Sequence, residues 1–267
     1  MDFRGNAKLP ARENQHVESE EGPSEEAENA EYDERTPLDQ RLKQRFARQL
    51  SPLIVTKDAP CPYLAGEQAG RPVYIFVHGI RGAGVEWWPV IPTLAANHPD
   101  AMYLFGWNPT QQRVEIIEAL VTGINRIAAC HPNGPTVVLA HSAGGMVAAY
   151  AVSRLAVESG PGVDVFTVAS PLSGAGLHNK AEDEEGENRF MKDLGATKTG
   201  FPAAAANVRV THLRTQYPAD QTMEPKFKQH APNEVGVGVE GATQIDLPDT
   251  LTHDGSLLFV ARQWVAH

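Results

Sequence analysis

One serine stands at the junction between an expected strand and an expected helix, in the segment AHSAGG at residues 140–145. A serine in such a strand-turn-helix junction occupies a turn so tight that the residues two positions away must be small. Ala140 and Gly144 meet this requirement, and Gly145 allows the helix to approach a strand closely. The pattern alone is weak, but its place between β-formers and a helix of small apolar residues predicts that Ser142 is a nucleophile for acyl transfer.

A second segment could stabilise the negative charge that develops during acyl transfer. His78 and Gly79 end an apolar run of β-formers at Val73–Val77, about 60 residues before Ser142. Acyl transfer needs two or more backbone N–H donors aimed at the tetrahedral oxyanion. In this architecture one donor comes from the loop after such a strand, and the other from the residue after the nucleophile. We therefore predict Ile80 and Ala143 as the donors of the oxyanion hole.

Two stretches together resemble a known family. VYIFVHGIRG (73–82) and VVLAHSAGGMVAAY (137–150) are similar to the lipase and esterase branch of the α/β-hydrolases, with Ala instead of the commoner first Gly, as in small bacterial lipases. The downstream segments resemble lipases and lipase-like deacylases, including the GPI inositol-deacylase-like group. The likeness runs from about Arg71 to the C-terminus. It implies the α/β-hydrolase fold, a triad in the order serine, acid, histidine, and hydrolysis of acyl esters without a cofactor.

The resemblance directs the choice of base and acid. His253 follows the last expected strand and precedes the last expected helix, which is the family's position for the base. Asp220 lies in a proline-bearing loop after the strand at 208–213, similar to the family's acid loop. A serine hydroxyl needs an oriented imidazole to take its proton, so the predicted triad is Ser142, Asp220 and His253. The rejected carboxylates are Asp164, Asp246 and Asp249.

The remaining histidines and aromatic residues receive structural interpretations. We expect His78 and His141 to support the backbone through hydrogen bonds and His212 to be packed in a strand. Five histidines in polar settings are expected at the surface, and no histidine or acidic spacing predicts a zinc or calcium site. Core packing is favoured over an acyl pocket for Trp87, Trp88, Met146 and Leu172. The expected surface histidines are His98, His131, His178, His230 and His267.

Strand and helix patterns alternate along the body of the chain. This alternation predicts a mostly parallel central sheet with helices on both faces. The helix at 110–131 should direct Val114, Ile117, Leu120, Val121, Ile124 and Ile127 to one face. The expected strands span 73–77, 101–107, 136–140, 163–168, 208–213 and 242–247, and the expected helices span 86–97, 110–131, 143–157 and 256–265.

The domain organisation follows from composition. Residues 1–35 are polar and acidic, which predicts a disordered tail. Residues 36–70 are expected to form an amphipathic helix and a linker, and residues 71–267 the catalytic domain. The helix is expected to dock on the body, although contact with a partner or lipid surface stays open. Within the domain, residues 171–206 interrupt the alternation of strands and helices. This segment predicts either a lid or cap, or an ordinary crossover with a solvated acidic loop.

Charge and cysteine usage exclude some functions. The net charge is −10, and residues 18–34 carry nine acidic side chains and no Lys or Arg, so the rest sums to about −1, that is −10 minus −9. Such a body has no bulk charge for nucleic acid, and no stretch suits a bilayer span. The start lacks a secretory signal, which favours the cytoplasm. Cys61 and Cys130 are expected to be ordinary thiols, with a single bridge left open.

The sequence therefore predicts a serine hydrolase of small-molecule or lipid esters. Two alternatives remain: a deacylase or thioesterase acting on a lipid-linked substrate, and a non-catalytic scaffold that works through the acidic tail and the amphipathic helix. The second alternative is disfavoured because a decayed site usually loses one of its catalytic residues.

Overall fold

The protein is described by a computed structural model that defines residues 51–52, 70–80, 84–96, 99, 101–108, 111–157, 160–172, 201–215 and 238–265. The predicted tail, the amphipathic helix and most of the predicted lid lie outside these residues. All described residues belong to one of the chain's two compact units, Leu42–His267. No helix in the described part of the chain is long and apolar enough to cross a membrane.

Seven parallel strands form one sheet in the order β1-β3-β2-β4-β5-β6-β7. Because all strands run in the same direction, their carboxyl ends lie at the same edge of the sheet. The segments 73–77, 136–140, 163–168 and 208–213 lie within observed strands, as predicted. The strands are β1 Ser51–Pro52, β2 Val73–Val77, β3 Ala101–Phe105, β4 Thr136–His141, β5 Val163–Val168, β6 Val208–Arg214 and β7 Thr243–Asp246.

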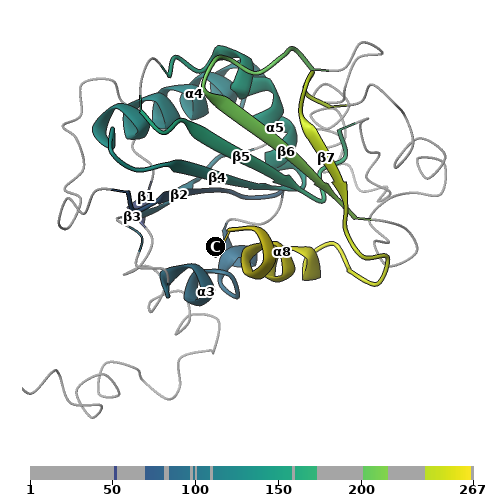
Figure 1. Cartoon of the computed structure of the whole chain (residues 1–267). Helices are drawn as coiled ribbons and strands as arrows, with labels where there is room; N and C mark the ends of the chain where they lie inside the picture. Colours follow the sequence, from purple (N-terminus) through teal and green to yellow (C-terminus); the bar gives the residue numbers. More distant parts are fainter. Residues whose placement is uncertain are drawn as a thin grey trace, which may run out of the picture. The chain divides into compact units, whose positions relative to one another are not determined.

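Helices cover both faces of the sheet (Figure 1). On one face lie α4, Arg113–Cys130, and α5, Ala143–Ala151; on the other lie α3, Ile91–Ala95, and α8, Gly255–Val260. A hydrophobic core lies between the sheet and the helices on each face, and alternate residues of β2 point into one core or the other. Val73, Ile75 and Val77 pack with α4 and α5, whereas Tyr74 and Phe76 pack with α3 and α8. The central strand is therefore buried on both sides, which explains its unbroken apolar run.

Three helices differ from the sequence expectation. The single helix expected at 86–97 is instead a 3-10 turn, Val85–Trp87, followed by α3, whose second residue is Pro92. The helix expected at 143–157 ends at Ala151 and continues as a 3-10 turn, Val152–Arg154. The C-terminal helix α8 is followed by a π-helical turn, Ala261–Val265.

Two residues of α4 also correct the expectation. Val114, predicted on the apolar face, is in the first turn of α4 and is 49% exposed, whereas the other predicted face residues are buried. Cys130, the last residue of α4, is disulfide-bonded, so the ordinary thiol expected there is wrong. The only other cysteine in the sequence is Cys61.

Candidate active site

Ser142 occupies the turn between β4 and α5 with φ 52° and ψ −125°. A left-handed φ at a residue other than glycine costs about 1–3 kcal/mol and persists only where the surroundings impose it. Here the Ser142 N–H donates to the Val168 carbonyl of β5 at 2.9 Å, which holds the turn against the sheet. The side chain is therefore raised at the carboxyl edge, in the strained backbone conformation expected of a nucleophile on such a turn.

The small residues after Ser142 are required by close contacts. A Cβ placed on Gly144 would lie 2.4 Å from the His78 carbonyl oxygen, and one on Gly145 would lie 1.8 Å from the Ser170 Oγ. Each distance is too short for any side chain, so both glycines allow α5 to begin directly beside β2 and β5. The structure thus explains the spacing of the AHSAGG segment by packing around Ser142.

The loop after β2 lies against Ser142. A Cβ built on Gly79 would be 3.2 Å from the Ser142 Cβ, so the Gly79–Ile80 backbone passes beside the serine. Ala143 is the first residue of α5 and is fully buried. Because the first N–H groups of a helix have no acceptor within it, the Ala143 amide suits an oxyanion. Ile80 follows Gly79 and Ala143 follows Ser142 in the chain, and both stay predicted donors of the oxyanion hole.

A carboxylate that sequence reasoning missed holds this loop. The Gly79 N–H donates to Oε1 of Glu86 at 2.7 Å, and the Glu86 side chain is only 9% exposed. Burial alone would raise the pKa of Glu86, but the His141 side chain and the Gly79 N–H outweigh it and hold this pKa below its ordinary value. Glu86 is thus an anion that fixes the loop. Its only sequence signal is an isolated acidic residue close after a glycine-bearing loop.

His141 lies beneath the catalytic edge beside Glu86. Its Nδ1 is 3.9 Å from Oε1 of Glu86, an ion-pair distance longer than a hydrogen bond, and its side chain is 4% exposed. Burial lowers the pKa of His141, and Glu86 only partly opposes this, so the ring is neutral at neutral pH. Neither ring nitrogen has a hydrogen-bond partner among the described residues. The predicted support of the backbone by the His141 side chain is therefore wrong.

His253 reaches the same edge from the turn before α8. Its ring centroid is 4.6 Å from that of His141, the residue immediately before Ser142. The Ser256 Oγ donates to the His253 carbonyl oxygen at 2.6 Å and so stabilises the turn that carries the imidazole. The fold thus brings His253 to the nucleophile's edge across 111 residues of chain, that is 253 minus 142.

The acid of the predicted triad, Asp220, lies outside the described residues. It follows β6 in the sequence, and β6 is separated from β4 only by β5. Asp164 forms a bidentate ion pair with Arg209, at 2.5 and 2.7 Å, and Asp246 lies 2.8 Å from Arg214. These partners give Asp164 and Asp246 structural roles.

The other described histidines are structural. His78 stacks on Trp107 at 5.2 Å, its Nε2 accepts from the Trp107 N–H, and its Nδ1 lies 2.6 Å from the Gly79 carbonyl oxygen, as its predicted support of the backbone requires. His212 is buried in β6, as predicted, with its Nε2 accepting from the Val239 N–H. His131 is buried, with Nε2 2.7 Å from the Arg71 carbonyl oxygen, so its predicted surface position is wrong.

The aromatic and apolar residues near the site are mainly core. Trp87 is 1% exposed and packs against Phe76 at 5.1 Å between ring centroids. Met146 and Leu172 are also buried, whereas Trp88 is half-buried. The preference for core packing over a pocket lining is confirmed for Trp87 and Met146.

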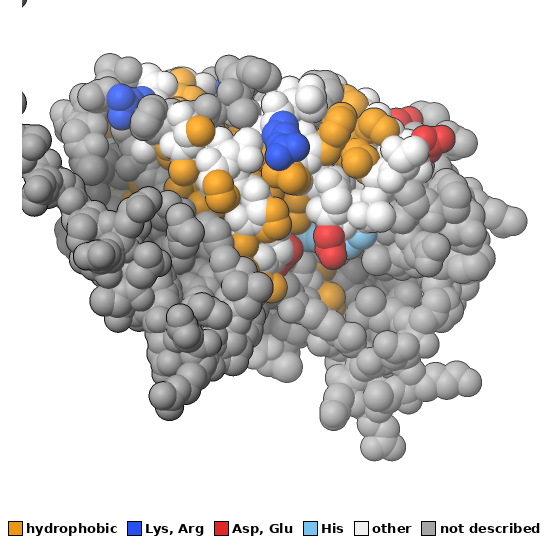
Figure 2. All heavy atoms as spheres, turned by 90° about the horizontal axis from the view of Figure 1, so that it is seen from below, with side chains coloured by type: hydrophobic (Ala, Val, Ile, Leu, Met, Phe, Trp, Pro, Cys, Tyr) orange, Lys and Arg blue, Asp and Glu red, His pale blue; other side chains and the backbone are white. Residues whose placement is uncertain are grey.

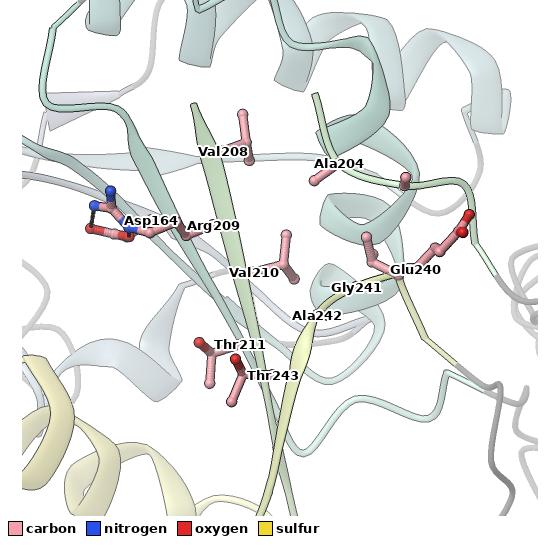
Figure 3. A pocket seen from close by; sticks show the side chains of 12 residues that line it. Asp164, Ala204, Val208, Arg209, Val210, Thr211, Glu240, Gly241, Ala242 and Thr243 are labelled. Atoms are coloured by element: carbon pink, nitrogen blue, oxygen red, sulfur yellow. Dashed lines mark hydrogen bonds and ion pairs between the residues drawn. The ribbon is translucent and has the colours of Figure 1, made fainter. Parts of the chain in front are cut away.

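The described residues form two pockets that lie at opposite ends of the strands. One, of about 470 Å³, lies along the amino-terminal halves of β6 and β7 and includes the Asp164–Arg209 ion pair (Figure 3). It lies at the opposite end of the strands from Ser142. The other, of about 520 Å³, is lined by residues that follow β2 and β3 at the catalytic edge: His78, Gly106, Trp107, Asn108 and Gln111. Only the second is placed to serve Ser142.

Comparisons with known proteins support the fold. No protein-family model matches the chain, and no curated protein matches its sequence. Among solved structures, lipase B from Aspergillus fumigatus superposes with a TM-score of 0.50 at 15% identity, covering 76% of this chain and 53% of the lipase. The chain thus spans about half of that lipase's length.

Two further solved structures are less similar. Est1E from Butyrivibrio proteoclasticus has a TM-score of 0.44 at 14% identity, covering 72% of this chain and 85% of Est1E. A lipase-esterase related protein from Clostridium acetobutylicum has a TM-score of 0.43 at 11% identity, covering 75% and 94%.

The strand order, the strained serine and the first of these superpositions define the class of fold. The chain has the α/β-hydrolase fold, with a parallel sheet and helices on both faces, and it resembles the Aspergillus lipase in structure. At such low identity the likeness concerns the fold alone, so the activity has to be argued from the site.

Proposed function

We propose that the protein is a serine hydrolase of carboxylic esters, of the lipase or carboxylesterase type. The observation that carries this proposal is the strained Ser142 at the carboxyl edge, with the Gly79–Ile80 backbone on one side and His253 supplied by the turn before α8. A strained backbone that raises a hydroxyl beside two sets of amides has no structural use in the sheet itself. Its use is to present a nucleophile.

In the proposed mechanism, the Ser142 hydroxyl attacks the ester carbonyl carbon while His253 accepts its proton. The N–H groups of Ile80 and Ala143 stabilise the oxyanion of the tetrahedral intermediate. The C–O bond to the alcohol then breaks, and His253 returns the proton to the leaving oxygen. Water, activated by His253, hydrolyses the acyl-enzyme. Asp220 is proposed to orient His253, as the acid does in other triads.

The hollow beside His78 and Trp107 supports a substrate with an apolar part. It lies after β2 and β3, next to the loop that carries Ile80, and Trp107 provides an aromatic wall. Ligand pockets commonly combine such walls with a few polar groups. We therefore propose that this hollow receives one arm of the ester. Rates with p-nitrophenyl esters of increasing acyl length test this assignment, because a filled hollow gives a maximum at one length.

Labelling with a fluorophosphonate probe tests the nucleophile. The folded wild type should be labelled, and Ser142→Ala should not. The matched control is Ser153→Ala, because Ser153 is another half-buried serine, in the 3-10 turn after α5, where its Oγ donates to the Tyr150 carbonyl oxygen. Ser153→Ala should label like the wild type. Absence of labelling in folded wild type would refute the proposal and favour a non-catalytic scaffold.

A further inference from the structure

We propose that His141, His253 and Asp254 form a binding site for Zn²⁺, a divalent transition metal ion, and that the bound ion inhibits the enzyme. The inhibitory effect rests on the proposed function, because it requires His253 to be the general base. The binding site itself depends only on the arrangement of the three side chains.

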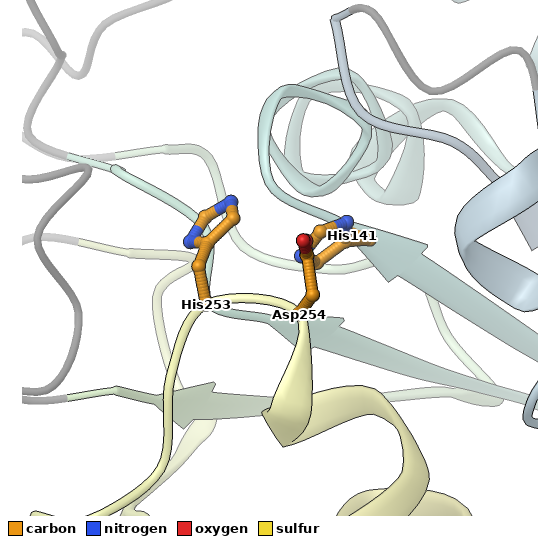
Figure 4. A group of neighbouring side chains, drawn as sticks. All are labelled: His141, His253 and Asp254. Atoms are coloured by element: carbon orange, nitrogen blue, oxygen red, sulfur yellow. The ribbon is translucent and has the colours of Figure 1, made fainter.

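The three side chains converge from two distant parts of the chain. His141 ends β4, and His253 and Asp254 precede α8 (Figure 4). One ligand atom from each lies within 4.8 Å of the others. Two imidazoles and one carboxylate with an open fourth position are a common donor set for zinc. The set therefore has the ligand types and the number that zinc prefers.

The distances need only a small adjustment. His141 Nε2 lies 4.0 Å from Oδ1 of Asp254. Zinc–ligand bonds of about 2.0–2.2 Å in a tetrahedron place neighbouring ligand atoms about 3.4 Å apart. The Asp254 side chain is 83% exposed and can turn to close this difference, while His141 stays fixed in the core. Asp254 is exposed and His253 is partly exposed, so an ion can reach them from solvent. Figure 2 shows acidic and histidine side chains next to one another on one surface of the protein.

His141 supplies an independent reason to expect a ligand. The residue is only 3% exposed, yet neither of its ring nitrogens has a hydrogen-bond partner among the described residues. Burial of an unpaired polar atom costs about 1–3 kcal/mol in proteins, so such atoms usually have a partner. The Nε2 of His141 lies on the side of Asp254, where a metal ion would provide that partner.

The other side of His141 carries the group that metal-binding histidines usually have. Nδ1 faces Glu86 at 3.9 Å, and Oε2 of Glu86 also lacks a hydrogen-bond partner among the described atoms. A histidine that binds a metal commonly donates its second N–H to a carboxylate, which fixes the ring and makes it a better ligand. The cluster thus contains both the ligands and their support.

Binding at this site would disable the proposed hydrolase. A metal-bound nitrogen of His253 has no free lone pair to accept a proton, and the ion would hold the turn that carries His253 and Asp254 towards His141. Ester hydrolysis should therefore fall as Zn²⁺ occupies the site, and a chelator should restore it.

The test is calorimetric titration of the tag-free full chain with ZnCl₂ at pH 7.5, with Asp254→Asn and its control Asp249→Asn. Asp249 is exposed in the segment that links β7 to α8. We expect one Zn²⁺ per wild-type chain, binding at least tenfold weaker in Asp254→Asn and unchanged binding in Asp249→Asn. Glu86→Gln, which weakens the supporting carboxylate, should bind about 10–100-fold more weakly.

Ester hydrolysis measured in parallel separates the two proposals. Inhibition by Zn²⁺ with the wild-type dissociation constant, relieved in Asp254→Asn, would support both. Binding that depends on Asp254 in a protein without esterase activity would support the metal site and refute the proposed function. Absence of binding, or equal binding by Asp254→Asn and the wild type, as expected for adventitious binding to the acidic residues 18–34, would overturn the metal site.

Discussion

The contact between Glu86 and the loop after β2 makes a quantitative prediction about catalysis. In Glu86→Ala the buried Gly79 N–H loses its acceptor at 2.7 Å, and the backbone beside Ser142 loses its anchor. An unsatisfied buried donor costs about 1–3 kcal/mol. If the loop is restrained by this hydrogen bond in the transition state, the rate should fall by about 5- to 150-fold, at about 1.4 kcal/mol per factor of ten.

The assay is hydrolysis of p-nitrophenyl acetate, with the melting temperature as a check on folding. Because Glu86 acts through the amide of the loop and does not touch the ester, kcat should fall while KM stays nearly constant. Glu86→Gln keeps a carbonyl acceptor and should lose less activity than Glu86→Ala. The control is Glu118→Ala, which removes an exposed carboxylate on α4 paired with Arg154 and should stay within about twofold, because surface ion pairs contribute little.

Two results would refute this reasoning. A folded Glu86→Ala that keeps more than half of the wild-type kcat would show that the loop holds its position without the carboxylate. A rise in KM with unchanged kcat would assign Glu86 to substrate binding instead of to the oxyanion loop.

Three further predictions concern packing, pH and the acid. Gly144→Ala places a Cβ 2.4 Å from a backbone oxygen and should destabilise the protein by about 1–3 kcal/mol in urea titration, whereas Gly106→Ala, with open space around it, should not. Burial lowers the pKa of His212 to about 4, so its neutral form stabilises the fold above pH 6.5, and about 3 kcal/mol should be lost as the pH falls to about 4. His212→Gln should lack this part of the pH dependence, and an identical profile would contradict the assignment. Asp220→Asn should lower kcat about a hundredfold or more, whereas Asp246→Asn should remain active; the reverse result would identify Asp246 as the acid.

The core of the site could be predicted from sequence because its signals are local. The strained turn at Ser142 depends on small residues within two positions, and the loop after β2 ends an apolar strand, so both patterns lie in short windows. The fold class could be predicted for the same reason. Each buried parallel strand shows as a short, continuous apolar run, and such runs alternate with helical patterns along the chain. The place of His253 depended on the family resemblance.

Pairings between distant residues could not be predicted in this way. Glu86 is one of 33 acidic residues, and nothing near it in the sequence indicates that its carboxylate accepts from Gly79 beneath the nucleophile. The same holds for His131, whose partner is a carbonyl 60 residues away, and for Val114, which is exposed although its position in the apolar pattern predicts burial.

The sequence by itself determined which serine stands on the tight turn between a strand and a helix and which class of sheet carries it, because these depend on backbone geometry and on hydrophobic periodicity within one element. The tertiary structure decided which side chains surround Ser142. His141 and Asp254 are 113 residues apart, that is 254 minus 141, and meet only because the sheet brings the end of β4 to the turn before α8. Local rules contain no information on such distances, since these are set by how the layers pack.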